Sequence, residues 1–152
     1  MNNAEGEARR WYAQAENDLA FAKIGLREGF YAQTCFVSQQ AVEKALKAVH
    51  YGRGQRVVLG HSLWELLRGL LANEPKLAAH RDLARMLDQY YIPTRYPNGL
   101  PSGAPFEIFT ESQARAAADG AEAILSDLGA LLPPGALAGD PYGFTIRNVF
   151  PT

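Results

Sequence analysis

The sequence predicts an all-α protein that folds as an antiparallel, up-down bundle of four to five helices. Apolar residues recur three and four positions apart along five stretches of the chain, which is the spacing of one helix face. Glycine or proline follows each stretch, and most of the connections between stretches are short. Short connections place consecutive helices side by side in opposite directions, so that their apolar faces are buried together.

The first two predicted helices occupy residues 8–26 and 31–52. Glu43 and Lys47 stand four apart in the orientation that favours an ion pair. Asp18 lies beside the first apolar face, where a charge must be paired, so we expect it to accept a hydrogen bond. The inward faces of the two helices consist of Ala8, Trp11, Ala15, Leu19, Ala22 and Leu26, and of Ala32, Phe36, Val42, Leu46 and Val49.

Two shorter helices are predicted next. Ser62 is a suitable N-cap for a helix over residues 63–73, which Pro75 follows. The next helix covers roughly residues 76–91 and carries Leu83, Leu87 and Tyr90 on one face.

The last predicted helix spans about residues 110–132, and two consecutive prolines end it because proline cannot continue a helix. A chain of 152 residues is typical of one domain. We therefore expect a helical bundle over residues 1–132 and a tail over residues 133–152. The stretch "FTIRNVF" at residues 144–150 could form a short strand, and we expect the tail to lie over the bundle or a neighbouring subunit.

A loop of about sixteen residues, 92–107, separates the last two helices and contains four prolines. Irregular loops of this length are uncommon in compact domains and are usually functional or disordered. Pro93 and Pro97 flank Arg95 and Tyr96. The prolines either end the preceding helix or hold these two side chains ready for a ligand.

Composition excludes several classes of protein. Fifteen basic and sixteen acidic residues nearly balance, so the net charge does not indicate nucleic acid or membrane. The single Cys35 excludes an internal disulfide framework, and no cysteine–histidine cluster suggests a metal site. The start lacks the pattern of a secretory signal, and no apolar run approaches the ~18 residues that span a bilayer. We expect a cytoplasmic protein with no metal and no cofactor.

Sequence motifs of common enzymes are also missing. The chain has no P-loop, dinucleotide fingerprint, HExxH or GxSxG motif. The segment "HRDLARML" is similar to a kinase catalytic loop, but Leu87 occupies the position of the metal-binding asparagine and no glycine-rich loop precedes it. Locally, four lysines and arginines and no acid lie between residues 44 and 61, and such a patch attracts phosphates or acidic partners.

Four stretches together resemble the HEPN family, the higher eukaryotes and prokaryotes nucleotide-binding domain. They are "WYAQAENDLAFAKIGL", "YAQTCFVSQQAVEKALKAV", "GHSLWELL" and "YYIPTRYP", in the order expected for that family. The resemblance implies a helical bundle that is often a homodimer. It also implies a nucleotide- or RNA-binding module that works with a separate minimal nucleotidyltransferase, in a pair similar to a toxin and its antitoxin.

Three functions stay open at this point. In a binding module, Lys44, Lys47 and Arg95 would contact phosphates, and Tyr91 or Tyr96 would stack on a base. Other HEPN relatives are metal-independent endoribonucleases with an R-x4-6-H motif, and "RVVLGH" matches its spacing through Arg56 and His61, although relatives usually carry a polar residue at the position of Val57. The third function is a non-catalytic dimerisation scaffold.

The binding and ribonuclease hypotheses share one geometric expectation. In an up-down bundle, the junctions after the second and fourth helices lie at the same end. Basic and aromatic side chains from these junctions would then meet in one cleft at that end.

Overall fold

The structure is a computed structural model that describes residues 3–133. All the regular secondary structure within this range is helical, which confirms the predicted all-α bundle. The predicted tail lies outside the described residues beyond Pro133, and so does the predicted strand at residues 144–150.

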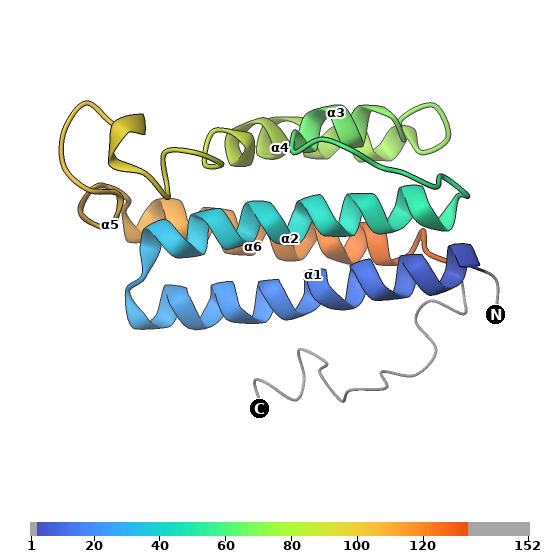
Figure 1. Ribbon diagram of the computed structural model, residues 1–152, viewed down its shortest axis with the longest axis horizontal. Coiled ribbons are helices and arrows are strands. Elements are labelled where there is room, and N and C mark those ends of the chain that lie inside the picture. Colours follow the sequence, from blue (N-terminus) through green and yellow to red (C-terminus); the bar gives the residue numbers. More distant parts are fainter. Residues whose placement is uncertain (1–2, 134–152) are drawn as a thin grey trace.

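Three long helices form the larger part of the bundle, α1 (Asn3–Glu28), α2 (Tyr31–Gly52) and α6 (Glu111–Gly129). The first two form an antiparallel hairpin that turns at Gly29, whose φ of 85° is a backbone conformation that favours glycine. The third, α6, lies beside both of them and runs in the same direction as α2 (Figure 1). The packing of Pro133, which follows the end of α6, against Gly52 at the end of α2 shows this direction.

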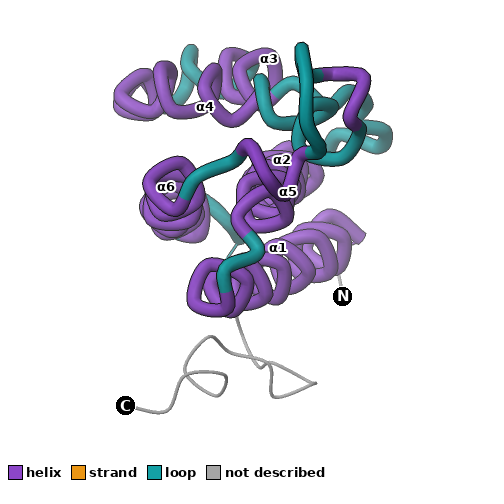
Figure 2. Tube along the Cα trace, turned by 90° about the vertical axis from the view of Figure 1, so that its left-hand side faces the viewer, coloured by secondary structure: helices purple, strands orange, loops and turns teal. Residues whose placement is uncertain are grey.

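A second layer of shorter helices covers α2 and α6, as seen end-on in Figure 2. It contains α3 (Leu63–Arg68), the 3-10 helix η1 (Pro75–His80) and α4 (Arg81–Asp88). The long loop that follows is partly helical, with η2 (Pro97–Gly99) and α5 (Pro105–Ile108).

The two helices predicted over residues 63–73 and 76–91 are shorter in the structure. After α3 and after α4 the backbone changes to tighter bonds between residues three apart, such as Leu70 N to Leu67 O at 2.9 Å and Tyr90 N to Leu87 O at 2.9 Å. The helix predicted over residues 76–91 does not resume beyond this turn, because Pro93 has no N–H to donate.

The segment between α2 and α3 runs back along α2 instead of turning at its end (Figure 1). It has no regular secondary structure, and Val57 and Leu59 are 67% and 82% exposed, whereas Val58 between them is only 8% exposed. Because of this return, α2 and α4 end at opposite ends of the bundle (Figure 1), so the expectation that the two junctions share one end does not hold. His61, at the far end of the returning segment, still comes close to the residues that follow α4.

Small residues allow the helices to pack closely. A Cβ atom at Gly120 of α6 would lie 2.4 Å from a methyl carbon of Leu83, and one at Gly129 would lie 2.5 Å from the hydroxyl of Tyr12. That hydroxyl donates a hydrogen bond of 2.7 Å to the carbonyl of Leu125. Cys35 is completely buried, and burial raises the pKa of its thiol to about 12, so the thiol stays protonated near neutral pH.

Candidate functional site

Three side chains gather where the returning segment meets the end of α4. The ring of His61 stacks on that of Tyr91, with the ring centres 4.7 Å apart and the planes inclined by 18°. The guanidinium carbon of Arg95 lies 4.5 Å from the centre of the same tyrosine ring. Arg95 and His61 therefore share Tyr91 as a common support.

Arg95 is held by aromatic rings and backbone rather than by a carboxylate. Its guanidinium carbon lies 4.5 Å from the ring centre of Phe36 on α2 and 5.2 Å from that of Tyr96. Its Nε donates a hydrogen bond of 2.8 Å to the carbonyl of Tyr91. Within residues 3–133 no acid pairs with it, which leaves the two terminal nitrogens available to an anion.

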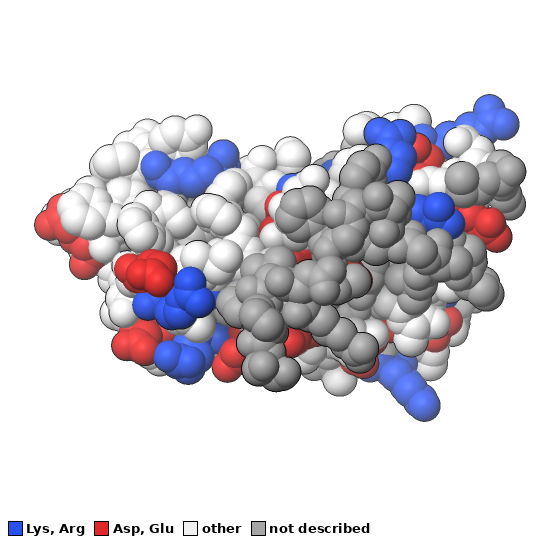
Figure 3. All heavy atoms as spheres, turned by 90° about the horizontal axis from the view of Figure 1, so that it is seen from below, with Lys and Arg blue, Asp and Glu red and all other residues white. Residues whose placement is uncertain are grey.

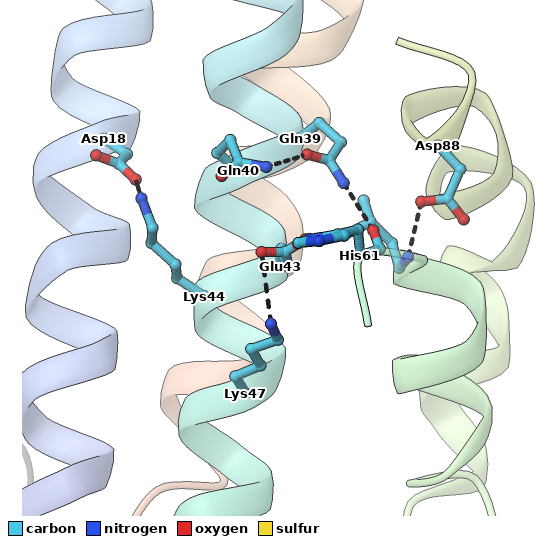
Figure 4. Close-up of polar contacts among 9 residues, drawn as sticks. Asp18, Gln39, Gln40, Glu43, Lys44, Lys47, His61 and Asp88 are labelled. Carbon is cyan, nitrogen blue, oxygen red and sulfur yellow. Dashed lines mark hydrogen bonds and ion pairs between the residues drawn. The ribbon is translucent and has the colours of Figure 1, made fainter. Parts of the chain in front are cut away.

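His61 is oriented by a buried carboxylate of α2. Its Nδ1 lies 2.9 Å from Oε1 of Glu43, whose side chain is only 6% exposed (Figure 4). An ionised carboxylate only accepts hydrogen bonds, so Nδ1 carries the proton in this contact and Nε2 is the nitrogen left free. The His61 side chain itself is 59% exposed, so it can reach a ligand from solvent.

The backbone of His61 is also fixed by α2. The side chain of Gln39 donates a 2.9 Å hydrogen bond to the carbonyl of His61, and Gln40 donates one of 2.7 Å to the amide oxygen of Gln39 (Figure 4). Gln39 is fully buried. These two glutamines therefore position the histidine.

Asp88, at the end of α4, anchors the start of α3 and was not identified from the sequence. Its carboxylate accepts hydrogen bonds from Ser62 Oγ at 2.9 Å, Leu63 N at 2.7 Å and Trp64 N at 3.2 Å. Ser62 caps α3 as predicted, since its hydroxyl accepts from Glu65 N at 3.2 Å. Nothing in the local sequence indicates the Asp88 contact, because its partners lie about 25 residues earlier.

The structure separates the other predicted site residues from this cluster. Lys44 pairs with Asp18, which confirms that the aspartate has a hydrogen-bonding partner. Lys47 is 8% exposed, lies 3.7 Å from Glu43 as the predicted ion pair, and reaches His61 only through that glutamate (Figure 4). Arg56 is exposed on the returning segment and has no hydrogen bond or ion pair with the residues between 3 and 133.

Charges elsewhere are mixed. On the face seen in Figure 3, outside the residues drawn in grey, lysines and arginines are interspersed with acidic residues. Within the described residues, no group of three histidine, cysteine, aspartate or glutamate side chains is placed to hold a metal ion. Among the described helices, none combines the length and apolar character that crossing a bilayer requires.

Known structures resemble this chain along most of its length. TT1696 from Thermus thermophilus is 41% identical, with a TM-score of 0.79, over 87% of this chain and 100% of that one. ST0689, described as an archaeal HEPN homologue, is 36% identical, with a TM-score of 0.67, over 86% and 98%. A HEPN domain protein of Thermotoga maritima, tm0613, is 33% identical, with a TM-score of 0.65, over 80% and 96%.

No curated protein matches the chain. The model of the HEPN domain family matches residues 8–131, which include most of α1, all of α2 and the whole His61–Tyr91–Arg95 cluster. This match covers most of the sequence. Two of the similar solved structures are also described as HEPN proteins. The chain is a member of the HEPN domain family.

Proposed function

We propose that this HEPN protein binds a nucleotide or RNA through Arg95, Tyr91, Tyr96 and His61, and that it acts with a separate minimal nucleotidyltransferase. The observation that carries the binding proposal is an arginine that contacts the rings of both Phe36 and Tyr91 and has no acidic partner among the described residues. Among the described residues, by contrast, several arginines form ordinary exposed ion pairs, such as Arg115 with Glu111.

The chemistry of the cluster suits a phosphate with a base attached to it. A guanidinium presents donors in a fork that matches phosphate oxygens, and its stacking on rings fixes the fork before the ligand arrives. Less entropy is then lost on binding. Tyr96 is 50% exposed, so its ring is accessible to a base.

Arg95→Ala is expected to weaken the binding of ATP or a short RNA by about 10- to 150-fold, because a charge-assisted hydrogen bond contributes about 1.5–3 kcal/mol. Isothermal titration calorimetry measures this directly. Arg95→Lys should recover only part of the affinity, because it keeps the charge and loses the fork. The matched control is Arg115→Ala, which removes an exposed, ion-paired arginine. Wild-type protein that binds neither ligand would refute the proposal.

The partnership with a nucleotidyltransferase, in the manner of a toxin and antitoxin, is supported by the family resemblance, as is a homodimer. Co-expression with the product of a neighbouring gene, followed by light scattering on a sizing column, measures both assemblies. A monomer that never co-elutes with such a product would contradict them.

A second candidate, a metal-independent endoribonuclease, is favoured by the contact between His61 and Glu43. A histidine oriented by a buried carboxylate can take the proton of a 2′-hydroxyl, and an arginine can stabilise the charge on the phosphate. The sequence motif assigns Arg56 to that role, whereas Arg95 shares Tyr91 with His61.

If the chain cleaves RNA in the presence of a chelator, His61→Ala is expected to lower the rate by about 10²- to 10⁴-fold. Comparing Arg56→Ala with Arg95→Ala in the same gel assay identifies the arginine that the reaction uses. Intact RNA after prolonged incubation with concentrated wild-type protein would exclude this candidate and leave the binding proposal standing.

A further inference from the structure

Two further arginines lie beside an aromatic ring next to the His61–Tyr91–Arg95 cluster. The guanidinium carbons of Arg81 and Arg85, one helical turn apart on α4, lie 5.8 Å and 5.5 Å from the ring centre of Trp64 on α3. Both arginines are exposed, and neither has an acidic partner within residues 3–133. The arrangement repeats that of Arg95 on Tyr91.

The two arginine sites are joined through Asp88. This carboxylate accepts from the backbone of Trp64 and from the side chain of Ser62, the neighbour of His61. The start of α3 lies against the end of α4. From there the ring of Trp64 contacts Arg81 and Arg85 on α4, and His61, three residues before Trp64, stacks on Tyr91 beyond the end of α4. The contacts between arginines and aromatic rings thus extend along α4, from Arg81 in its first turn to Arg95 beyond its end.

We propose that the ligand is an extended single-stranded RNA that runs along α4, with phosphates or bases held at Arg95 and again at Arg81 and Arg85. This inference rests on the proposed function and specifies its ligand class. A mononucleotide placed at Arg95 leaves the Trp64 site unused, whereas a strand of several nucleotides contacts both. Such strands are held by basic groups along the backbone and by stacking on ring faces.

The combination of exposed guanidinium groups and aromatic rings favours RNA over an acidic protein. Arg81 and Arg85 are exposed within cation–π distance of the Trp64 ring, and unpaired RNA bases stack on guanidinium planes as well as on aromatic rings. A carboxylate on a protein partner would use only the edge of the guanidinium. The exposed guanidinium groups of Arg81 and Arg85 and the half-exposed ring of Tyr96 are an advantage only to a ligand with flat groups of its own.

The test measures the affinity of the full chain for AMP and for 2′-O-methyl oligoadenosines of two, four, eight and twelve nucleotides, which cannot be cleaved through the 2′ position. We expect affinity to rise with length up to several nucleotides. In the double variant Arg81→Ala/Arg85→Ala the affinity for the eight-nucleotide strand should fall about tenfold or more. The slope of log affinity against log salt should fall by about 1.4. Binding of AMP should not change.

The matched control is Arg68→Ala/Arg115→Ala, which removes two exposed arginines that are paired with Glu65 and Glu111. Circular dichroism checks that each variant keeps its helices. A double variant at residues 81 and 85 that binds the long strand as wild type does, while Arg95→Ala loses it, overturns this inference and leaves the proposed function intact. Polyglutamate that competes as well as RNA also overturns it. Failure of wild-type protein to bind AMP and every strand refutes the proposed function itself.

Discussion

Glu43→Ala is expected to lower the free energy of unfolding by about 3–5 kcal/mol, the largest stability effect among the substitutions considered. The variant leaves Lys47 charged in a place where its side chain is only 8% exposed, with Trp11 on one side. A buried charge without a partner is costly because it has lost its hydration and gained nothing in return. The same change also frees His61 from the contact that orients its ring.

Urea denaturation of Glu43→Ala, of Lys47→Met and of the double variant Glu43→Ala/Lys47→Met measures this effect. The double variant should recover much of the lost stability, because it removes the unpaired charge and keeps an apolar chain against Trp11. Glu111→Ala, at an exposed ion pair, is the control and should leave the midpoint nearly unchanged. If the losses in unfolding free energy of the two single variants add up to the loss in the double variant, Glu43 and Lys47 do not interact as a buried pair.

Asp88→Ala is expected to cost about 2–4 kcal/mol, because three donors at the start of α3 lose one carboxylate. The short helix α3 has few other bonds at its first turn, so its start should loosen together with His61 and Trp64. We therefore expect weaker ligand binding as well as lower stability. This combination separates Asp88 from residues that act on stability alone.

Thermal and urea unfolding give the stability of the Asp88 variants, and the calorimetric titration with short RNA gives their affinity. Asp88→Asn keeps one acceptor oxygen and should lose about half as much stability. Asp82→Ala, which removes an exposed acid from the same helix, serves as the control. An Asp88→Ala variant as stable as this control would show that the carboxylate does not hold α3.

Much of the fold is predictable from local sequence. The three-and-four spacing of apolar residues predicts α1, α2 and α6, because a long amphipathic helix has few other ways to bury one face. Ser62 indicates the start of α3, and the spacing of Glu43 and Lys47 indicates their ion pair, because both contacts form within one or two helical turns. The stretches that resemble HEPN proteins also predict the family.

The long helices, their local contacts and the family are therefore predictable from the amino-acid sequence, because they depend on residues close together in the chain or on a pattern spread along it. The return of the segment after α2 was not predictable from the sequence and is seen only in the folded chain, where it brings His61 to Glu43 and Tyr91. Only the folded chain also shows that Asp88 anchors α3 and that Lys47 is buried, while Arg95 lies on aromatic rings instead of pairing with an acid of the described chain. The spacing of apolar residues indicates which face of a helix is buried, and it can be read from neighbouring residues. The path of a loop depends instead on packing between segments that are distant in sequence.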